Sequence, residues 1–390
     1  MLGIGVPQAG PGSVAHITRH ARRISLPTCT GTGEDAFFGG KDSNVAGGAV
    51  TGVLSGAFNM VCDIAASIGG GTSNAISSGN NSAGLSFIGS GNANAITSPA
   101  SFIGSGSENS ISANAAVVGG GYENNIIGNF SNAGAYGAIV EGENNTIQGL
   151  GAYGGFDGFI GAGENNLLEG EYGVINGGES NTLTGPFATI GGGSHNQASG
   201  TYATVAGGNG NVATGNASFA GGSSATATYQ GDFVWSDAAG GSPVSSTTGN
   251  QFMVRAIGGV VFYTNASNSV GATLSAGSGS WSSLSDRAAK SDIAKISDAG
   301  ILAKVASLPI SEWSYTSERG VRHVGPMAQD FYAAFGVGED DRHITTVDES
   351  GVALAAIKAL NAKNARLQSE LTNLRKQVVK LTAIVSAIKR

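Results

Sequence analysis

The most informative property of this 390-residue sequence is how little charge it carries. Asp, Glu, Lys and Arg make up only 12% of the residues, against about 25% in a typical soluble domain. An ordinary globular enzyme does not have this composition. The apolar fraction is nevertheless 41%, which is too high for a disordered chain. The composition therefore favours a regular architecture punctuated by its 65 glycines.

Cysteines, basic residues and long apolar runs are also scarce. The two cysteines, Cys29 and Cys62, can form at most one disulfide bond and lack the spacing of a metal site. We expect neither a transmembrane helix nor a signal peptide, because no apolar run of about 18 residues occurs and the N-terminal residues lack a basic region followed by an apolar one. Residues 42–280 contain thirteen acidic residues and one basic residue, Arg255. This negative charge disfavours nucleic-acid binding.

The charge that is present lies mainly at the C-terminal end. Of the 47 charged residues, 27 lie in residues 281–390, whereas 59 of the 65 glycines lie before residue 281. This change of composition predicts a domain boundary near residue 284. Residues 1–37 include a small basic cluster, and we interpret them as an attachment segment or a poorly ordered terminus.

A short pattern repeats along residues 38–230. An apolar residue is followed by glycine three positions later, asparagine six positions later and a second apolar residue eight positions later. Twelve units follow the pattern, mostly at intervals of 15 residues, with Lys41 in place of the glycine in the first and Ala225 in place of the asparagine in the last. The units begin at Phe38, Val53, Ile68, Ile88, Ile103, Val118, Ile139, Ile160, Ile175, Ile190, Val205 and Phe219. Such a constant register predicts a repeat protein.

Fifteen residues are enough for one coil of a β-solenoid with two short strands and two turns. Glycine provides the backbone angles that the turns need. Asparagine at a fixed position can form a ladder in which each amide bonds to the copies above and below. Three longer intervals follow Ile68, Val118 and Ile139, and we predict loops there on one side of the solenoid, where a receptor contact would fit.

Segments such as "IGGGTSNAI" resemble the head repeats of trimeric bacterial surface adhesins. This resemblance covers residues 38–230 and implies a parallel β-roll that assembles as a trimer. Residues 231–284 follow with the aromatic-rich segments "GDFVWSD" and "NQFMVRAIGGVVFYTN", which predict a β collar that ends the solenoid. A cap of this kind is needed because the last coil would otherwise expose an open edge. The expected fold is thus mainly β, a solenoid followed by a collar.

Residues 285–390 have the composition of a small α+β domain that ends in a coiled coil over 353–390. Apolar residues from Ile357 to Ile388 alternate in steps of three and four, with Asn364 as the one polar member. This heptad pattern predicts a coiled coil. In this register Glu370 and Arg375 have the spacing of an interchain salt bridge, although a helix packed on its own domain is the alternative. β-branched residues at a with Leu at d favour dimers by rule, but the solenoid and the resemblances favour a trimer.

A serine stands five residues before a lysine at the predicted boundary, in "LSDRAAKSDI". A serine hydroxyl becomes nucleophilic when a base removes its proton, and a desolvated lysine can be that base. The pair alone is a weak signal. This segment, followed by "RHVGPMAQDF" and "TTVDESGVALAAIKAL", resembles the intramolecular chaperone domain of endosialidase-type phage tail spikes and fibres. The resemblance covers residues 281–390.

The resemblance implies a domain that trimerises, drives assembly of the stalk before it and then cuts itself off. It assigns the nucleophile to Ser285, the general base to Lys290 and the cut to the Leu284–Ser285 bond, which releases residues 285–390. It also matches His323 to a histidine needed for assembly or cleavage, while a purely structural role for His323 remains open. The implied activity is a single-turnover serine endopeptidase without a cofactor or metal, and no other enzymatic activity is expected.

The resemblance also implies the partners of the chain and its place in the virion. These partners are two further copies in a homotrimer, a host surface receptor that is a glycan or an outer-surface protein, and the virion tail or baseplate, reached through the N-terminal segment. The expected location is the virion tail after assembly in the host cytoplasm. A parallel solenoid of three chains has non-local contacts and folds slowly, and a chaperone domain that gathers the chains suits it.

Two other functions stay open at this point. The first is a bacterial cell-surface trimeric adhesin with the same head. The second is a glycan-degrading tail spike, whose candidate carboxylates are Glu164, Glu169, Glu171 and Asp157. Solvated charges at coil edges are the simpler interpretation of these four residues, because no paired carboxylates stand among aromatic sugar platforms.

Overall fold

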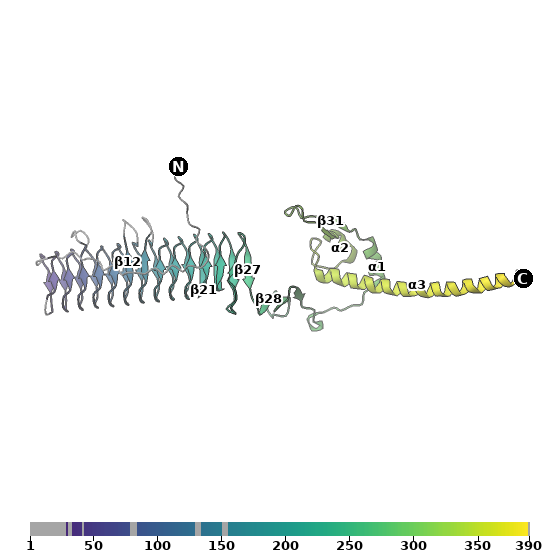
Figure 1. Cartoon of the computed structure of the whole chain (residues 1–390), viewed down its shortest axis with the longest axis horizontal. Coiled ribbons are helices and arrows are strands. Elements are labelled where there is room, and N and C mark those ends of the chain that lie inside the picture. The colour runs from purple at the N-terminus through teal and green to yellow at the C-terminus, as the bar shows by residue number, and fades with distance from the viewer. Residues whose placement is uncertain are drawn as a thin grey trace, which may run out of the picture. The chain divides into compact units, whose positions relative to one another are not determined.

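The fold is described from a computed structural model of the chain, shown in Figure 1. It describes residues 29, 33–40, 43–78, 84–128, 134–149 and 155–388. The chain divides into two compact units, Met1–Ile257 and Gly258–Arg390, and each is described by itself. The predicted N-terminal segment lies almost entirely outside the described residues, as do the central parts of the three predicted loops.

The first unit is a parallel β-solenoid with about 13 coils that are about 15 residues apart. Each coil contributes one short strand to each of two sheets, called sheet A and sheet B. Sheet A contains β1 (Phe37–Phe38), β3 (Gly52–Val53), β5 (Ser67–Ile68), β7 (Phe87–Ile88), β9 (Phe102–Ile103), β11 (Val117–Val118), β13 (Ala138–Ile139), β15 (Phe159–Ile160), β17 (Val174–Ile175), β19 (Thr189–Ile190), β21 (Thr204–Asn209), β23 (Phe219–Ser223), β25 (Phe233–Ser236) and β27 (Phe252–Arg255). Sheet B contains β2 (Val45–Ala46), β4 (Met60–Val61), β6 (Ala75–Ile76), β8 (Ala95–Ile96), β10 (Ser110–Ile111), β12 (Asn125–Ile127), β14 (Thr146–Gln148), β16 (Leu167–Leu168), β18 (Thr182–Leu183), β20 (Gln197–Ala198), β22 (Val212–Ala213), β24 (Ala225–Ala227) and β26 (Val244–Ser245).

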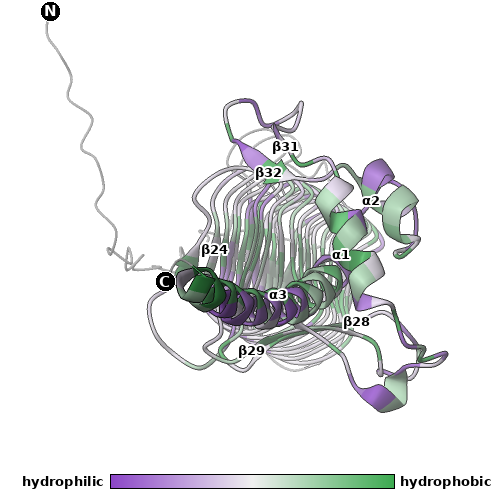
Figure 2. Cartoon of the chain, turned by 90° about the vertical axis from the view of Figure 1, so that its right-hand side faces the viewer, coloured by the Kyte–Doolittle hydropathy of each residue, from purple (hydrophilic) through white to green (hydrophobic). Residues whose placement is uncertain are grey.

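The core of the solenoid is a double column of inward-facing aliphatic side chains. In most strands the first residue faces outward and the second is buried, as in β9, where Phe102 is exposed and Ile103 is buried. The paired sheet B strand, β10, supplies Ile111 in the same way. Register places equivalent residues of successive coils side by side, for example Ile103 beside Val118. Figure 2 shows the coils stacked behind one another in this register. The predicted solenoid is therefore confirmed.

The predicted asparagine ladder is also present, and it runs through eleven coils. Each Oδ1 accepts bonds from the backbone N–H and side-chain Nδ2 of the asparagine in the next coil, at 3.0 and 3.1 Å between Asn109 and Asn124. The Nδ2 group of Asn124 also donates to Gly120 O and Gly142 O. From Asn59 onward the ladder asparagines are almost fully buried. They provide the polar groups that satisfy the turn carbonyls inside the narrow rod. The ladder consists of Asn44, Asn59, Asn74, Asn94, Asn109, Asn124, Asn145, Asn166, Asn181, Asn196 and Asn211.

Two details of the solenoid differ from the sequence interpretation. The last predicted unit begins one residue too early. In the pairing of β21 with β23, the buried Val205 lies beside Ala220, so Ala220 faces the core and Phe219 faces outward. A register shift between Val205 and Gly208 accounts for the difference. The parallel sheet also continues beyond residue 230, since β25 and β27 extend sheet A to Arg255. The collar segments are thus divided between the solenoid and the second unit.

A polar cluster closes the solenoid at its C-terminal end. Arg255 Nε contacts the Asp237 carboxylate at 3.0 Å, and its other nitrogens bond to Ser236 Oγ and Ser242 O. The backbone N–H of Ile257 also donates to Asp237 at 2.7 Å. The pKa of Asp237 lies below its usual value because of the Ile257 hydrogen bond and the Arg255 guanidinium, while partial burial opposes the shift. These bonds hold the backbone where β27 leaves the sheet.

The two cysteines form one disulfide bond at the other end, between Cys29 and Cys62. Cys62 directly follows β4, whose last residue is Val61, so the bond ties residue 29 to the second strand of sheet B. Gly33 continues the attachment, because its N–H donates to Ala46 O at 3.0 Å. The segment before β1 is therefore joined to the first coils both covalently and by a hydrogen bond.

The second unit contains two small antiparallel sheets and three α-helices. The first sheet consists of β28 (Gly259–Tyr263), β29 (Gly271–Ser275) and β30 (Trp281–Ser283), and the second of β31 (Ser311–Trp313) and β32 (His323–Gly325). The helices are α1 (Asp298–Ser307), α2 (Ala328–Phe335) and α3 (Thr346–Ile388), with a 3-10 turn, η1, at Arg287–Ala289. α1 packs on α3, where Lys358 Nζ lies 2.6 Å from an Asp298 carboxylate oxygen. Helices and strands are both present, as the predicted α+β domain requires, and α3 begins before the predicted coiled coil.

We predict that Asn124→Ala destabilises the solenoid by about 3 kcal/mol. The change removes the hydrogen bonds of a buried amide and leaves the carbonyls of Gly120 and Gly142 without that donor. Asn125→Ala is the matched control, because this neighbouring side chain is only partly buried and bonds once, to Glu123 O. Thermal or denaturant unfolding followed by circular dichroism measures both. Equal shifts in the two variants would contradict a stabilising role for the ladder.

Candidate functional site

The candidate cleavage bond lies between an ordered strand and an ordered turn. On its N-terminal side, β30 pairs with β29, and the N–H of Leu284 donates to Gly271 O at 3.4 Å. On its C-terminal side, Asp286 caps η1, and its carboxylate accepts a bond from the Ala288 N–H at 2.9 Å. Both flanks are thus fixed by local hydrogen bonds, whereas the Leu284–Ser285 bond itself belongs to neither element.

The turn η1 explains the spacing of five residues between the serine and the lysine. The backbone N–H of Lys290 donates to Arg287 O at 3.2 Å, and this turn brings Lys290 back toward Ser285. Lys290 Nζ then lies 2.7 Å from Ser285 Oγ, within hydrogen-bond distance. The two residue types that the sequence singled out are therefore adjacent in space. An amine in this position can exchange a proton with the hydroxyl.

The pair is open to solvent in the single chain. Ser285 and Lys290 are both exposed, and so is Leu284, with 53% of its surface accessible. A lysine acts as a base after it has lost its proton, and removal from water is the usual physical cause of that loss. The single chain supplies the contact between the two groups but not the enclosure.

His323 belongs to a separate aromatic cluster on the β31–β32 hairpin. Its ring stacks on Trp313 with centroids 4.8 Å apart and meets Tyr315 edge to face at 5.5 Å. Its Nε2 atom is buried without a hydrogen bond, 3.7 Å from a Glu318 carboxylate oxygen. Within the described residues, no hydrogen bond joins His323 to Ser285 or Lys290. The structure of one chain therefore brings the serine and lysine together and leaves the histidine in a packing role.

An ion pair on the same hairpin supports this cluster. Arg322 Nε donates to a Glu312 carboxylate oxygen at 2.8 Å, and the two residues lie on opposite strands or at their ends. This hydrogen bond lowers the pKa of Glu312, and it raises the pKa of Arg322. Because both groups are exposed, the pair orients the hairpin more than it stabilises it.

The four carboxylates considered for glycan cleavage do not form one site. Glu164 lies in the connection from sheet A to sheet B, in a ladder with Glu143 and Glu179. Glu169, at the end of a sheet B strand, accepts a bond from Gln148 at 2.9 Å. Glu171 and Asp157 lie in the connections from sheet B back to sheet A. Glu164 is thus separated from the others by the width of a coil.

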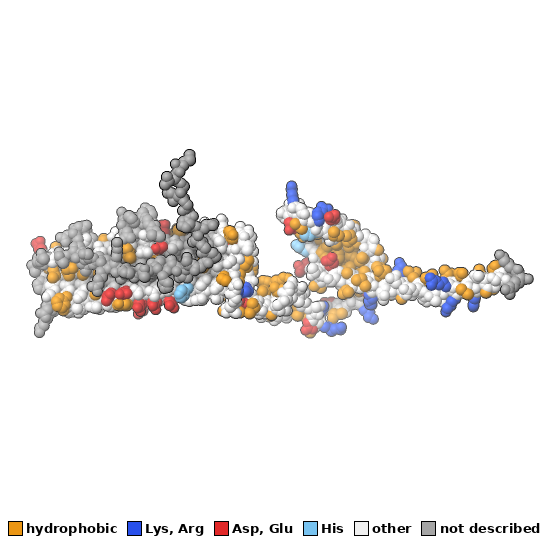
Figure 3. All heavy atoms as spheres, in the orientation of Figure 1, with side chains coloured by type: hydrophobic (Ala, Val, Ile, Leu, Met, Phe, Trp, Pro, Cys, Tyr) orange, Lys and Arg blue, Asp and Glu red, His pale blue; other side chains and the backbone are white. Residues whose placement is uncertain are grey.

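Two edges of the solenoid carry different side chains. The connections from sheet A to sheet B carry the glutamate ladder, and Figure 3 shows a row of acidic side chains along one edge of the solenoid. The connections from sheet B to sheet A carry an aromatic ladder with neighbouring centroids 5.0 to 5.7 Å apart. The aromatic ladder consists of Tyr136, Phe156, Tyr172, Phe187 and Tyr202. This ladder was not predicted, although its members recur at intervals of 15 residues from Tyr172 to Tyr202.

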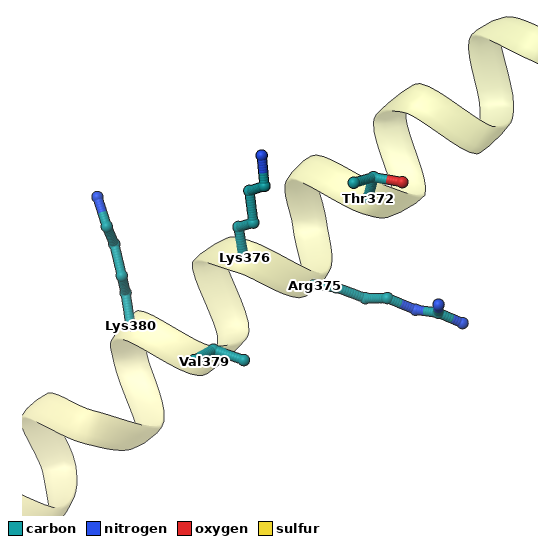
Figure 4. A pocket seen from close by; sticks show the side chains of 5 residues that line it. All are labelled: Thr372, Arg375, Lys376, Val379 and Lys380. Carbon is teal, nitrogen blue, oxygen red and sulfur yellow. The ribbon is translucent and has the colours of Figure 1, made fainter.

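A depression on α3 offers no enclosed site. It is lined by residues of one helix only, so that no second element forms an opposite wall (Figure 4). Its basic side chains extend away from the helix, with Lys376 and Lys380 on one side and Arg375 on another. In the described part of the chain, no helix combines the length and apolarity of a membrane span.

Comparison with known protein families identifies the C-terminal part of the chain. Residues 285–337 match the family model described as the chaperone of endosialidase. This part of the chain is therefore similar to endosialidase chaperone domains. The matched region begins at Ser285, directly after the candidate cleavage bond, and extends two residues beyond the end of α2. No curated protein matches the chain.

An endosialidase chaperone domain that follows a β-solenoid fits a phage tail fibre or tail spike with an intramolecular chaperone. The resemblance drawn from "LSDRAAKSDI" and "RHVGPMAQDF" is confirmed for residues 285–337. The matched family is also named as a peptidase family. The whole of α3 lies after the matched region.

Proposed function

We propose that this chain is a receptor-binding tail fibre or spike whose chaperone domain assembles three copies and then leaves by autoproteolysis between Leu284 and Ser285. The observation that carries the proposal is the 2.7 Å contact between Lys290 Nζ and Ser285 Oγ at the first residues of the matched domain. The proposed location is the virion tail, with the N-terminal segment as the attachment to the tail or baseplate.

The trimer is supported by the unpartnered seam of α3. Its heptad residues are all at least 46% exposed in the single chain, although they are large and apolar. A face of this kind is stable in water only when other helices cover it. Glu370 already pairs with Arg366 on its own helix at 2.8 Å. The apolar seam and Asn364 therefore contribute more to the association of the helices than the predicted Glu370–Arg375 bridge. The seam consists of Ile357, Leu360, Leu367, Leu371, Leu374, Val378, Leu381, Val385 and Ile388.

The proposed cleavage is an acyl transfer followed by hydrolysis. Lys290 Nζ accepts the proton of Ser285 Oγ, and the oxygen attacks the carbonyl carbon of Leu284. The Leu284–Ser285 C–N bond breaks, and the ammonium of Lys290 returns the proton to the departing nitrogen. Water then hydrolyses the ester between Leu284 and the Ser285 hydroxyl. The products are a carboxylate on Leu284 and a free amine on Ser285.

Assembly and cleavage are coupled in this proposal. Because Ser285 and Lys290 are exposed in one chain, the desolvation that frees the amine of its proton comes from the neighbouring copies. Cleavage before assembly is thereby disfavoured, and the stalk keeps its chaperone until three chains have met. After cleavage the folding route is lost while the fold remains, which leaves a kinetically stable fibre.

For His323 we propose a role in assembly. Its ring is held between Trp313 and Tyr315, and its buried Nε2 has no hydrogen bond within its own chain. A buried polar atom without a hydrogen bond is costly, and a small shift of the Glu318 carboxylate, now 3.7 Å away, on assembly would satisfy it. The histidine then stabilises the trimer rather than transferring a proton to or from the serine.

For receptor contact we propose the edge that carries the aromatic ladder. The three long repeat intervals all fall in connections from sheet B to sheet A, after β6, β12 and β14. Tyr136 is exposed in the connection after β12, and Tyr172 and Tyr202 are exposed in later connections from sheet B to sheet A. Large aromatic side chains at a surface are a common feature of binding sites, and a glycan or an outer-surface protein would be the ligand.

We expect wild-type protein to give two bands on a denaturing gel, corresponding to residues 1–284 and 285–390, and Ser285→Ala to give one. Loss of the hydroxyl removes the nucleophile and blocks acyl transfer completely. Ser291→Ala is the matched control and should be cut like the wild type, since this exposed serine bonds only to Asp292. Mass spectrometry of the fragments locates the cut. A wild-type chain that stays whole after it has assembled would rule out the peptidase part of the proposal.

Adjacent valines of α3 test the coupling between assembly and cleavage. Val378 belongs to the apolar seam, and Val379 lies outside it, yet both are exposed, by 57% and 69%. Val378→Asp should abolish the trimer and strongly slow cleavage, because three carboxylates would meet in one layer. Val379→Asp should preserve both. Light scattering after size exclusion measures the mass, and the gel measures the cut. Full cleavage of a monomeric Val378→Asp variant would contradict the coupling.

A further inference from the structure

The outward-facing side of sheet A is unusually apolar for a solvent-exposed sheet. In each strand one residue faces outward beside its counterparts in the neighbouring coils, and we call this line of residues row A. Ten of its fourteen members are apolar, seven of these are phenylalanines, and none is charged. Several stack directly on one another, such as Phe219 on Phe233 with centroids 4.6 Å apart. Row A consists of Phe37, Gly52, Ser67, Phe87, Phe102, Val117, Ala138, Phe159, Val174, Thr189, Thr204, Phe219, Phe233 and Phe252.

The corresponding line on sheet B, called row B, has another character. Seven of its thirteen members are polar, and none is aromatic. The edge from sheet A to sheet B carries the glutamate ladder of Glu143, Glu164 and Glu179. Row A is therefore the more apolar of the two faces and the one that carries aromatic side chains. Row B consists of Val45, Met60, Ala75, Ala95, Ser110, Asn125, Thr146, Leu167, Thr182, Gln197, Val212, Thr226 and Ser245.

Threefold symmetry decides which of these faces can lie inside an assembly. In a parallel trimer, each residue near the axis meets two copies of itself. At the glutamate edge, three stacked columns of like charge would face one another in a poorly hydrated space, which is strongly unfavourable. On row A, phenylalanine would meet phenylalanine in coil after coil, and apolar surface would be removed from water.

We infer that row A faces the threefold axis and that its occupants are the row A faces of two further copies of this chain. The inference rests on the trimer proposed above and adds the face by which the solenoids meet. It leaves the aromatic ladder and the glutamate edge on the outside of the stalk, free for other contacts. The apolar outer face is thus complementary to itself, as a symmetric contact requires.

The face runs along the length of the solenoid. Fourteen strands at about 4.8 Å spacing give a strip about 60 Å long. With a width of about 10 Å, this strip offers about 600 Å² on each chain, shared between two neighbours, so the row A contact is smaller than a standard interface of about 800 Å² per partner and adds to the contact through α3. Exposed phenylalanines supply much of this area, with Phe87, Phe102 and Phe252 exposed by 37%, 39% and 68%.

Two threonines provide a matched test. Thr189 belongs to row A and Thr182 to row B, they lie in neighbouring strands of the chain, and both are partly exposed. Neither side chain is needed for the core, since their inward neighbours Ile190 and Leu183 fill it. Thr189→Arg in the full-length protein should lose most of its trimer, because three guanidinium groups would meet near the axis. Thr182→Arg should keep the trimer and its melting temperature.

A second pair of variants keeps the test valid if Thr189→Arg does not fold. Thr189→Cys and Thr182→Cys are small changes, and mild oxidation should join two chains through residue 189 and not through residue 182. A dimer band on a non-reducing denaturing gel, lost on reduction, is the readout. A trimer that crosslinks through 182, or through neither position, would overturn the assignment of row A. A wild-type protein that is monomeric by light scattering would instead overturn the proposed trimer itself.

Discussion

The solenoid depends on the hydrogen bonds that join each coil to the next through one buried asparagine. A coil of fifteen residues encloses only a few inward side chains, so its apolar core is too thin to order the turns. Asn124 links its own turn carbonyl at Gly120, the next turn at Gly142 and the asparagines on either side. Each amide thereby satisfies backbone groups that water cannot reach. The repeat tolerates changes in outward residues because this interior pattern stays constant.

Much of this architecture could be predicted from the sequence because its physical cause recurs every fifteen residues. The positions of glycine, asparagine and the inward aliphatic residues identify the coils and even the ladder. The interpretation failed where the repetition is imperfect. Phe219 satisfies the apolar pattern one residue before Ala220, and only the pairing with Val205 shows which of the two is buried. Likewise β25 and β27 lack the asparagine and therefore escape the repeat, although they continue the same sheet.

The candidate site shows the same division between local and non-local information. The contact between Ser285 and Lys290 could be expected, because a single capped turn is enough to bring residues five apart together. The surroundings of His323 could not, since Trp313 and Tyr315 reach it only through pairing of two strands that lie ten residues apart. The enclosure of the serine and lysine is less predictable still. It requires surfaces from other copies, and neither the sequence nor one folded chain contains them.

A regular stalk creates a problem that its own interactions cannot solve. Because successive coils present nearly the same ladder and the same apolar row, three chains could align with a shift of one coil and still bury phenylalanine against phenylalanine. The alignment must come from a part of the chain that does not repeat. α3 is such a part, because its seam contains one asparagine, Asn364, and a misaligned helix would place that amide against leucine. In the proposed fibre the chaperone domain therefore sets the alignment of the stalk. Once the row A contacts have formed over the length of the rod, separating the chains would expose all of them together, and the domain that aligned them is no longer needed.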